Sequence, residues 1–229
     1  MSINNEQEKQ SKIIKPYFSC EWIEGGLAFA HDSLHICCEP QGWFHISDFH
    51  GGEIPVSAIR SAREQLKDDI QKNDRHNCHR CPKLHYQTWE QKRYLVDIIN
   101  FSHFYLCNLK CNYCYLQIKN IDARNDKPYN IYPILKSMIE QGQISPGVKV
   151  FWGGGEPTIL KDFDKIIELL SEIQAFQTFN TNSVVFSSAV YNYLEKSDRF
   201  FLTTSIDAGT PETFIKIKGA DLFHRTVDN

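Results

Sequence analysis

Three closely spaced cysteines carry the strongest chemical signal in the sequence. Cys107, Cys111 and Cys114 form a C-x3-C-x2-C run. Three thiolates on one loop can hold one face of an iron–sulfur cube, whose irons prefer thiolate ligands. A cube has four irons, so three protein ligands leave one iron open to a substrate or cofactor. The alternatives are three buried thiols, or a zinc knuckle with a distant fourth ligand.

A second candidate site is a glycine-rich run from Trp152 to Thr158, which reads Trp-Gly-Gly-Gly-Glu-Pro-Thr. Consecutive glycines let the backbone approach a ligand closely, so Gly154 and Gly155 can present their backbone groups to it. Glu156 places a carboxylate beside that backbone, and a carboxylate is suited to holding a ligand ammonium group. Taken alone, the run is also typical of a tight turn.

The other five cysteines lie in the first part of the chain, and they are Cys20, Cys37, Cys38, Cys78 and Cys81. The spacing of Cys78 and Cys81 is typical of a metal knuckle, which needs two further ligands from elsewhere. Cys20 and one of the adjacent Cys37 and Cys38 can supply them. Ligand identity alone does not decide the metal, so zinc is one candidate for this site.

Length and composition favour a globular protein of the cytoplasm. The chain has 229 residues, of which 41 % are hydrophobic and 23 % charged, as in a folded domain with or without an appendage. A net charge of -3 gives no sign of a nucleic-acid or anionic-membrane partner. The first twelve residues lack an apolar core, and no apolar stretch is long enough to span a bilayer. In a reducing cytoplasm, clustered cysteines are ligands or catalysts more often than disulfides.

The residue pattern divides the chain near residue 95. We expect a polar tail over residues 1–15, a small α+β cysteine-rich module over 16–94 and an α/β domain over 95–229. In the module, short strands are expected over Gly26–Ala30 and Ser33–Cys38. A helix is expected over Ser57–Lys72, whose apolar residues fall on one face.

The second part alternates between strand and helix patterns. Strands are expected over Phe101–Leu106, Val148–Trp152, Thr178–Phe186 and Arg199–Ile206. Helices are expected over Tyr132–Gln141, Asp162–Phe176 and Ser188–Lys196, with another beginning at Pro211. This alternation indicates parallel βαβ units, in which functional residues gather at the carboxyl ends of the strands. Both candidate motifs directly follow expected strands.

Together these motifs resemble the radical S-adenosylmethionine (radical SAM) superfamily, from about Phe101 to the end of the chain. Tyr113, just before the last motif cysteine, matches an aromatic position that lies near the adenine in this family. Thr181-Asn182-Ser183 resembles the family's third-strand motif, and the segment from Ser205 to Phe214 resembles its fourth-strand motif. Lys216-Ile-Lys218-Gly219 falls where many members carry Ile-Arg-Gly. Lys218 keeps the positive charge but loses the bidentate fork of arginine.

The resemblance implies a reaction and its cofactors. The three motif cysteines would hold a 4Fe-4S cluster whose open iron binds the amino and carboxylate groups of S-adenosylmethionine. One electron, from a donor such as a flavodoxin or ferredoxin, would split this cofactor into methionine and a 5'-deoxyadenosyl radical. The radical would abstract a hydrogen atom from a peptide or small-metabolite substrate.

The resemblance also assigns roles to individual residues. Gly154, Gly155 and Glu156 would hold the methionine amino group of S-adenosylmethionine. Ser205 would approach its ribose or carboxylate, and Lys218 its carboxylate. The rival interpretation is a non-catalytic remnant or accessory protein that binds a cluster or zinc without completing turnover.

The N-terminal cysteines resemble the first half of a SPASM domain, a module that holds auxiliary clusters in many radical SAM enzymes. Here it would precede the barrel, with one auxiliary 4Fe-4S cluster, or zinc, on Cys20, one of Cys37 or Cys38, Cys78 and Cys81. The 129 residues from Phe101 onward suffice for about four βα units of about 30 residues. We therefore expect a partial barrel truncated before its fifth and sixth strands, with an open edge that a partner chain could complete.

Overall fold

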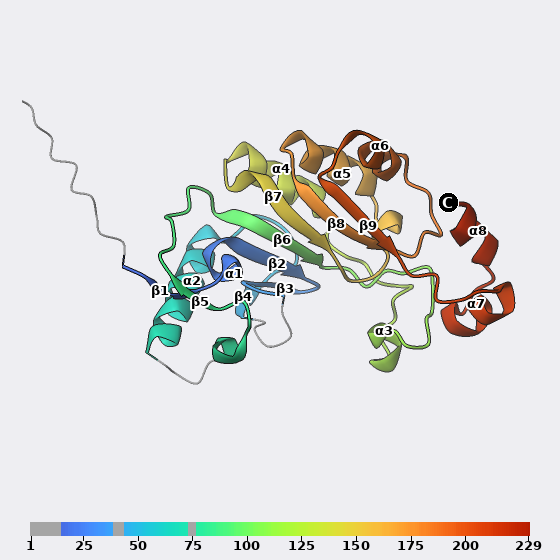
Figure 1. Ribbon diagram of the computed structural model, residues 1–229, viewed down its shortest axis with the longest axis horizontal. Coiled ribbons are helices and arrows are strands. Elements are labelled where there is room, and N and C mark those ends of the chain that lie inside the picture. The colour runs from blue at the N-terminus through green and yellow to red at the C-terminus, as the bar shows by residue number, and fades with distance from the viewer. Residues whose placement is uncertain (1–14, 39–43, 73–76) are drawn as a thin grey trace, which may run out of the picture.

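A seven-stranded, mostly parallel sheet forms the centre of the computed structural model (Figure 1), which describes residues 15–38, 44–72 and 77–229. The strand order is β4-β3-β2-β6-β7-β8-β9. Strand β2 and strands β6 to β9 run parallel, and β3 and β4 add antiparallel strands at one edge. The bounds are β2 (Gly26–Ala30), β3 (Ser33–His35), β4 (His45–Asp48), β6 (Val96–Ser102), β7 (Ile144–Trp152), β8 (Phe176–Thr181) and β9 (Phe200–Thr204). The α/β class expected from the sequence is confirmed.

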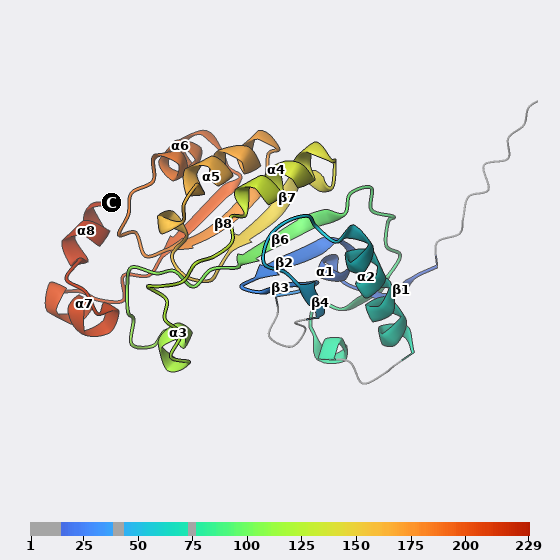
Figure 2. The same cartoon turned by 180° about the vertical axis from the view of Figure 1, so that it is seen from behind.

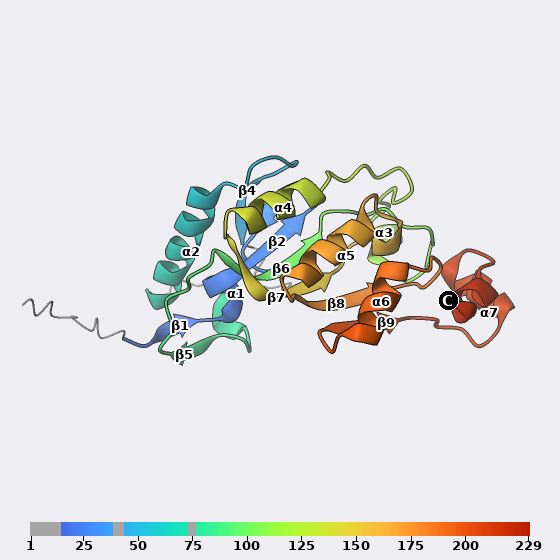
Figure 3. The same ribbon diagram turned by 90° about the horizontal axis from the view of Figure 1, so that it is seen from above.

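Three helices cover one face of this sheet, as Figures 1 and 3 show: α4 (Tyr132–Glu140), α5 (Phe163–Glu172) and α6 (Ser188–Lys196). Helix α5 buries Phe163, Ile166, Ile167 and Leu170, whose three- and four-residue spacing forms one apolar stripe. Strand side chains alternate between faces, so every second residue meets these helices. The other strand residues are left for the opposite face.

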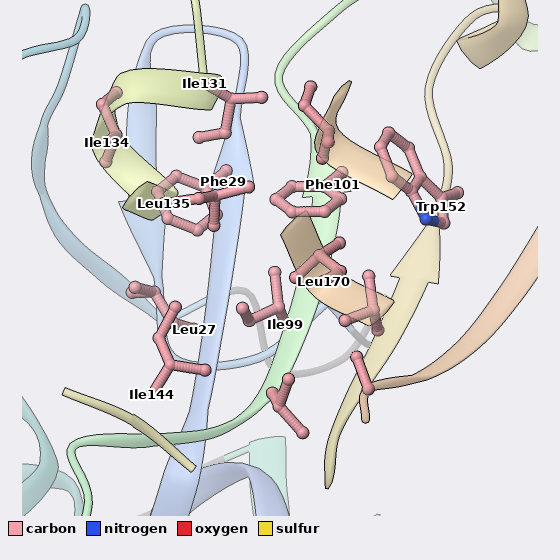
Figure 4. Packing of buried hydrophobic residues seen from close by; sticks show 14 of the residues in the cluster. Leu27, Phe29, Ile99, Phe101, Ile131, Ile134, Leu135, Ile144, Trp152 and Leu170 are labelled. Carbon is pink, nitrogen blue, oxygen red and sulfur yellow. The ribbon is translucent and has the colours of Figure 1, made fainter. Parts of the chain in front are cut away.

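The sheet is continuous across the boundary that the sequence places near residue 95. Strand β2 pairs in parallel with β6, with Phe29 opposite Phe101, and every residue of β2 is buried. Figure 4 shows Leu27 and Phe29 beside Ile99 and Phe101, in one core with residues of α4 and α5. A strand buried on both faces belongs in the middle of a parallel sheet. The cysteine-rich segment therefore supplies a central strand, and residue 95 does not mark a break in the core.

The remaining N-terminal elements pack around the amino ends of the parallel strands (Figure 2). They are α1 (Glu21–Gly25), α2 (Val56–Gln71), the 3-10 helix η1 (Asn77–Arg80) and a two-stranded antiparallel sheet of β1 (Tyr17–Ser19) and β5 (His85–Gln87). Helix α2 buries Ile59, Leu66 and Ile70 on one face, as its sequence pattern predicts. The expected tail over residues 1–15 lies outside the described residues except for Lys15.

The carboxyl ends of β6 to β9 lie near four short helical elements (Figures 1 and 2). They are α3 (Tyr115–Ile118), η2 (Pro157–Ile159), α7 (Pro211–Lys218) and α8 (Phe223–Asp228). Among the described residues β9 pairs only with β8. No described helix combines the length and apolar character required to cross a membrane.

The first strand of the parallel series differs from its expected position. It was expected over Phe101–Leu106, whereas β6 ends at Ser102. Val96, Ile98 and Ile99 are buried between the neighbouring strands β2 and β7, so the strand begins earlier. Beyond Ser102 the backbone N–H groups of Tyr105 and Leu106 bond the Asp126 carboxylate. These residues form a loop, which leads into the three-cysteine motif.

Candidate functional site

The three motif cysteines lie on the loop that connects β6 to α3, and we call residues 103–114 the cluster loop. All three thiols are half-buried and free of disulfides. The N–H of Cys107 donates to the carbonyl of Ala123 at 3.0 Å, and the N–H of Cys114 to the carbonyl of Cys111 at 3.1 Å. Cys114 is also the N-cap of α3. Backbone hydrogen bonds therefore position both ends of the motif.

Within the chain itself, the surroundings of Cys107 and Cys111 favour the protonated thiols. Burial, reinforced by the Glu156 carboxylate and the other two thiols, raises the pKa of Cys107 to about 11. Burial also raises the pKa of Cys111, although the nearby Lys218 ammonium opposes the shift. Metal ligation requires thiolates and releases their protons. Such a half-buried thiol set is chemically suited to a cationic iron cluster, which offsets the cost of burying the negative charge.

The glycine-rich run lies directly beside the cluster loop. The N–H of Gly155 donates to the Phe104 carbonyl at 3.0 Å, and that of Glu156 to the Leu106 carbonyl at 2.8 Å. A Cβ atom added to Gly155 would stand 2.0 Å from the Leu106 carbonyl oxygen, far inside van der Waals contact. We expected these glycines to allow a ligand to approach. In the structure, the missing side chain of Gly155 lets the cluster loop pack directly against the glycine run.

Glu156 is a buried carboxylate, 2 % exposed, with donors from three residues. Its Oε1 accepts hydrogen bonds from the hydroxyls of Thr158 at 2.6 Å and Thr181 at 2.8 Å, and from the Thr158 N–H at 3.2 Å. Its Oε2 accepts the N–H of Asn182 at 2.7 Å. A buried charge requires such partners. We expected Glu156 to bind a ligand amine, whereas its oxygens here hold the end of β8 and the loop after it.

Thr181 and Asn182 have a larger part than the turn role that their residue types suggest. Besides the Glu156 bonds, the Asn182 side-chain amide donates to Asn108 Oδ1 on the cluster loop at 2.7 Å. The glycine run, the third-strand motif and the cluster loop therefore form one hydrogen-bonded unit. The Thr-Asn-Ser motif was the available sequence signal for this link, and no motif marks Asn108.

Lys218, Tyr113 and Asp207 form a second hydrogen-bonded group at the cluster loop. Lys218 Nζ donates to Asp207 Oδ2 at 2.5 Å and to the Tyr113 hydroxyl at 2.8 Å, and that hydroxyl donates to Asp207 Oδ2 at 2.5 Å. The Lys218 side chain is only 3 % exposed. Burial disfavours its charge, but the hydrogen bonds to Asp207 and Tyr113 raise its pKa overall.

The same contacts, those from Lys218 first, lower the pKa of Asp207. We expected Lys218 to face the carboxylate of S-adenosylmethionine. The structure gives its ammonium a carboxylate within the chain, because a buried cation requires a nearby anion. Tyr113, expected near the adenine, is 53 % exposed and so retains an accessible ring.

Helix α7 is attached to the cluster loop by backbone bonds as well. The N–H of Lys110 donates to the Lys218 carbonyl at 3.0 Å, and that of Asn112 to the Ile217 carbonyl at 2.9 Å. Ser205, the fourth-strand candidate, follows β9 and is exposed. Its side chain makes no hydrogen bond to any residue that the structure describes.

The N-terminal cysteines gather at the other end of the sheet. Cys20 lies at the N-cap of α1 and is buried among Trp22, Ile36 and Leu66, and Cys37, Cys38 and Cys78 pack against this cluster. The N–H of Cys81 donates to the Cys78 carbonyl at 2.9 Å, closing the knuckle turn. The pairing of Ser19 with His85 brings the knuckle back towards Cys20. Burial and then the Cys20 and Cys81 thiols raise the pKa of Cys78 to about 11.

The cysteine arrangement can be compared with what each metal requires. Among residues 15–38, 44–72 and 77–229, no three His, Cys, Asp or Glu side chains meet closely enough to hold a single metal ion. A cube distributes its thiolates over separate irons. The donor type and the C-x3-C-x2-C spacing of Cys107, Cys111 and Cys114 suit such a cube.

A family model and several known proteins are similar to this chain. The family model of the Radical SAM superfamily matches residues 101–229. The Molybdenum cofactor biosynthesis protein 1 of Dictyostelium discoideum is 29 % identical over 157 residues, 62 % of this chain and 24 % of that protein. The GTP 3',8-cyclase of Mannheimia succiniciproducens is 26 % identical over 142 residues, 58 % of this chain and 42 % of that protein.

Among solved structures, Streptococcus suis SuiB bound to S-adenosylmethionine matches with a TM-score of 0.44 and 18 % identity. The match covers 76 % of this chain and 35 % of that chain. The matched part of the chain thus spans less than half the length of each of these three relatives. The family-model match covers more than half of the present chain, and the chain belongs to the radical SAM superfamily.

Proposed function

We propose that this chain is a radical SAM enzyme that holds a 4Fe-4S cluster on Cys107, Cys111 and Cys114 and acts on a peptide or small metabolite. The observation that carries the proposal is the attachment of the cluster loop to both the glycine run and α7 at the carboxyl edge of the sheet. An iron–sulfur protein that only carries electrons has no need of this arrangement. When bound, the cluster would supply the electron that cleaves S-adenosylmethionine reductively.

The chain's own residues would bind and orient that cofactor. The backbone of Gly154 and Gly155 would meet its amino group, and Glu156 would fix the loops around it instead of binding it directly. The exposed Tyr113 ring would lie against the adenine, and the exposed Ser205 hydroxyl would reach the ribose or carboxylate. Lys218 would act mainly by holding Tyr113 and Asp207 in place.

The sheet face opposite α4 to α6 supports a proposal for the kind of substrate. In β6 to β9 the only charged side chains are Asp97 and Lys149, and these are paired with Lys92 and Glu21. Near the carboxyl ends this face carries neutral polar groups, Asn100, Ser102, Asn180 and Thr203, which bond within each strand or across to the next. Such a surface favours a neutral polar group, such as a peptide amide, over a triphosphate.

We also propose a second metal site in the N-terminal segment. Cys20, Cys78, Cys81 and one of Cys37 or Cys38 would hold an auxiliary 4Fe-4S cluster in a SPASM-like arrangement, with zinc as the alternative metal. Cys20, Cys37, Cys38 and Cys78 pack in one cluster, and the Cys81 thiol acts electrostatically on Cys20 and Cys78. This proximity supports the proposal, and the number of cysteines suffices for one four-ligand site.

Anaerobic reconstitution tests both proposals. The full chain, loaded with iron and sulfide and reduced with dithionite in the presence of S-adenosylmethionine, should form 5'-deoxyadenosine. GTP should not accelerate this reaction. The matched variant with Cys107, Cys111 and Cys114 all replaced by Ala should form none, while retaining the iron and sulfide of the auxiliary site.

The outcomes separate the alternatives. A wild-type chain that binds iron and sulfide without forming 5'-deoxyadenosine would be an accessory protein or remnant. A triple variant that contains zinc and no iron would show that the N-terminal cysteines hold zinc.

A further inference from the structure

Asp126 is a buried carboxylate at the base of the cluster loop that no motif marks. It lies in the connection between α3 and α4, and its side chain is 5 % exposed. Its Oδ2 accepts the backbone N–H of Tyr105 at 2.5 Å and that of Leu106 at 3.1 Å. These two residues immediately precede Cys107, so a single carboxylate oxygen holds the backbone that delivers the first motif cysteine.

The other oxygen of Asp126 connects this loop to the N-terminal half. Asp126 Oδ1 lies 2.8 Å from Nε2 of His31, which occupies the turn between β2 and β3. The His31 ring also stacks on Tyr105, with centroids 4.6 Å apart and planes 4° from parallel. His31 thus contacts both the carboxylate and one of the residues that the carboxylate holds.

This contact set has the properties of a positioning device. Hydrogen bonds from N–H groups to a carboxylate are stronger than those to a neutral acceptor. A buried carboxylate without donors is destabilising, because it pays the cost of desolvation without hydrogen bonds in return. The Tyr105 and Leu106 N–H groups lie beyond the end of β6 and cannot bond a neighbouring strand, so they require other acceptors. Without Asp126, the segment between Ser102 and Cys107 would lose two of the bonds that define its path.

We propose that Asp126 is a positioning residue for the cluster loop, and that His31 ties this loop to the β2–β3 turn of the cysteine-rich segment. The proposal rests on the role of Cys107 as a cluster ligand. It extends that role by making the N-terminal segment a structural part of the catalytic site. Outer contacts that orient metal ligands commonly change metal affinity by 10- to 100-fold.

Hydrogen–deuterium exchange on the reconstituted full chain tests the proposal at the two amides concerned. In Asp126→Ala, exchange of the Tyr105 and Leu106 amides should accelerate by about 10-fold or more, because their acceptor is lost. In Asp126→Asn it should stay within about 3-fold of wild type, because the amide oxygen can accept the same bonds. His31→Phe keeps the ring stack but loses the Asp126 contact, and should give an intermediate rate.

The matched control is Asp122→Ala. Asp122 lies in the same connection, is exposed, and among the described residues its side chain bonds only Arg124 and Asn125. Its removal should therefore leave both amides unchanged. A second readout is iron release to a chelator, which should be about 10-fold faster in Asp126→Ala than in Asp122→Ala. Asp126→Asn should restore slow release.

Two results would overturn the proposal. One is that the Tyr105 and Leu106 amides of Asp126→Ala exchange at the wild-type rate. The other is faster exchange spread evenly over β6 to β9 in both Asp126 variants, which would indicate general destabilisation. The exchange measurement does not depend on S-adenosylmethionine cleavage, so an inactive chain would refute the proposed function without deciding the role of Asp126.

Discussion

At the residue scale, His103 is a neutral imidazole enclosed at the end of β6. It is 1 % exposed and packs against the rings of Phe101, Phe104 and Tyr129. Burial lowers the pKa of His103 to about 3, although Asp126 opposes the shift. Its Nδ1 has no hydrogen-bond partner among the described residues. A protonated His103 would therefore be a buried charge at the start of the cluster loop.

This burial predicts a loss of stability in mild acid. The unfolded chain protonates His103 near pH 6.5, and the folded chain does so only near pH 3. Between these values the unfolded state binds the extra proton, so stability falls as the pH is lowered. Between pH 7 and pH 5, His103 should lower the free energy of unfolding by about 2 kcal/mol.

Urea unfolding at both pH values would measure the effect. His103→Phe keeps an aromatic ring and removes the titrating group. Its free energy of unfolding should therefore fall by about 2 kcal/mol less than that of wild type between pH 7 and pH 5. Equal losses in the two proteins would show that His103 is accessible to protons in the folded state.

At the element scale, the glycine run joins β7 to η2 and packs against the cluster loop. Gly154 has a φ of +84°, in the left-handed region that favours glycine. Gly155 requires glycine for a different reason, since any side chain would collide with the Leu106 carbonyl. The fit between two loops after neighbouring strands therefore depends on the missing Cβ atoms.

A methyl group at Gly155 should separate the two loops. Gly155→Ala is expected to lower the free energy of unfolding by about 1–3 kcal/mol, as overpacking does, and to reduce the iron retained after reconstitution. The matched control is Gly209→Ala, because nothing lies within 4 Å of a Cβ added there. It should change stability by less than about 0.5 kcal/mol. Similar unfolding curves for the two variants would contradict the crowding argument.

At the scale of the whole molecule, the two cysteine groups lie at opposite ends of a shared sheet. Strand β2 follows α1, whose N-cap is Cys20, and ends at Ala30, just before His31, which stacks on Tyr105 of the cluster loop. The antiparallel β3 then leads back towards Cys37 and Cys38. Strand β6 spans seven residues, or about 23 Å, which sets the scale of their separation. A single core of β2, β6 and β7 lies between them.

A shared core predicts one cooperative unfolding transition. Phe29 is fully buried in β2, and its ring centroid lies 5.8 Å from that of Phe101. Phe29→Ala should therefore lower the free energy of unfolding by about 3–5 kcal/mol. It should also accelerate hydrogen exchange in β7 as strongly as in β2. Phe201→Ala, at a site 56 % exposed on β9, is the control and should cost less than about 1 kcal/mol. A variant that loosens β2 and leaves β7 protected would instead indicate two units that unfold separately, divided near residue 95.

The sequence by itself determined the features that depend on short-range spacing. The cysteine run, the glycine run and the βα alternation were sufficient to indicate the superfamily. The residue pattern placed α6 at Ser188–Lys196, as observed. It also located α2 and α5 to within a few residues. These signals can be read from residues close together in the sequence, because a helix face recurs every three to four positions and each motif spans only a few residues.

Only the tertiary structure decided which groups meet across long stretches of chain. Asp126 reaches His31 across 95 positions, Tyr113 reaches Asp207 across 94, and Glu156 reaches Asn182 across 26. No local pattern encodes such pairs. They arise because parallel strands bring their carboxyl ends to one edge, and because buried charges there must find partners. For the same reason β2 looked like part of an N-terminal hairpin in sequence and became a central strand in the fold.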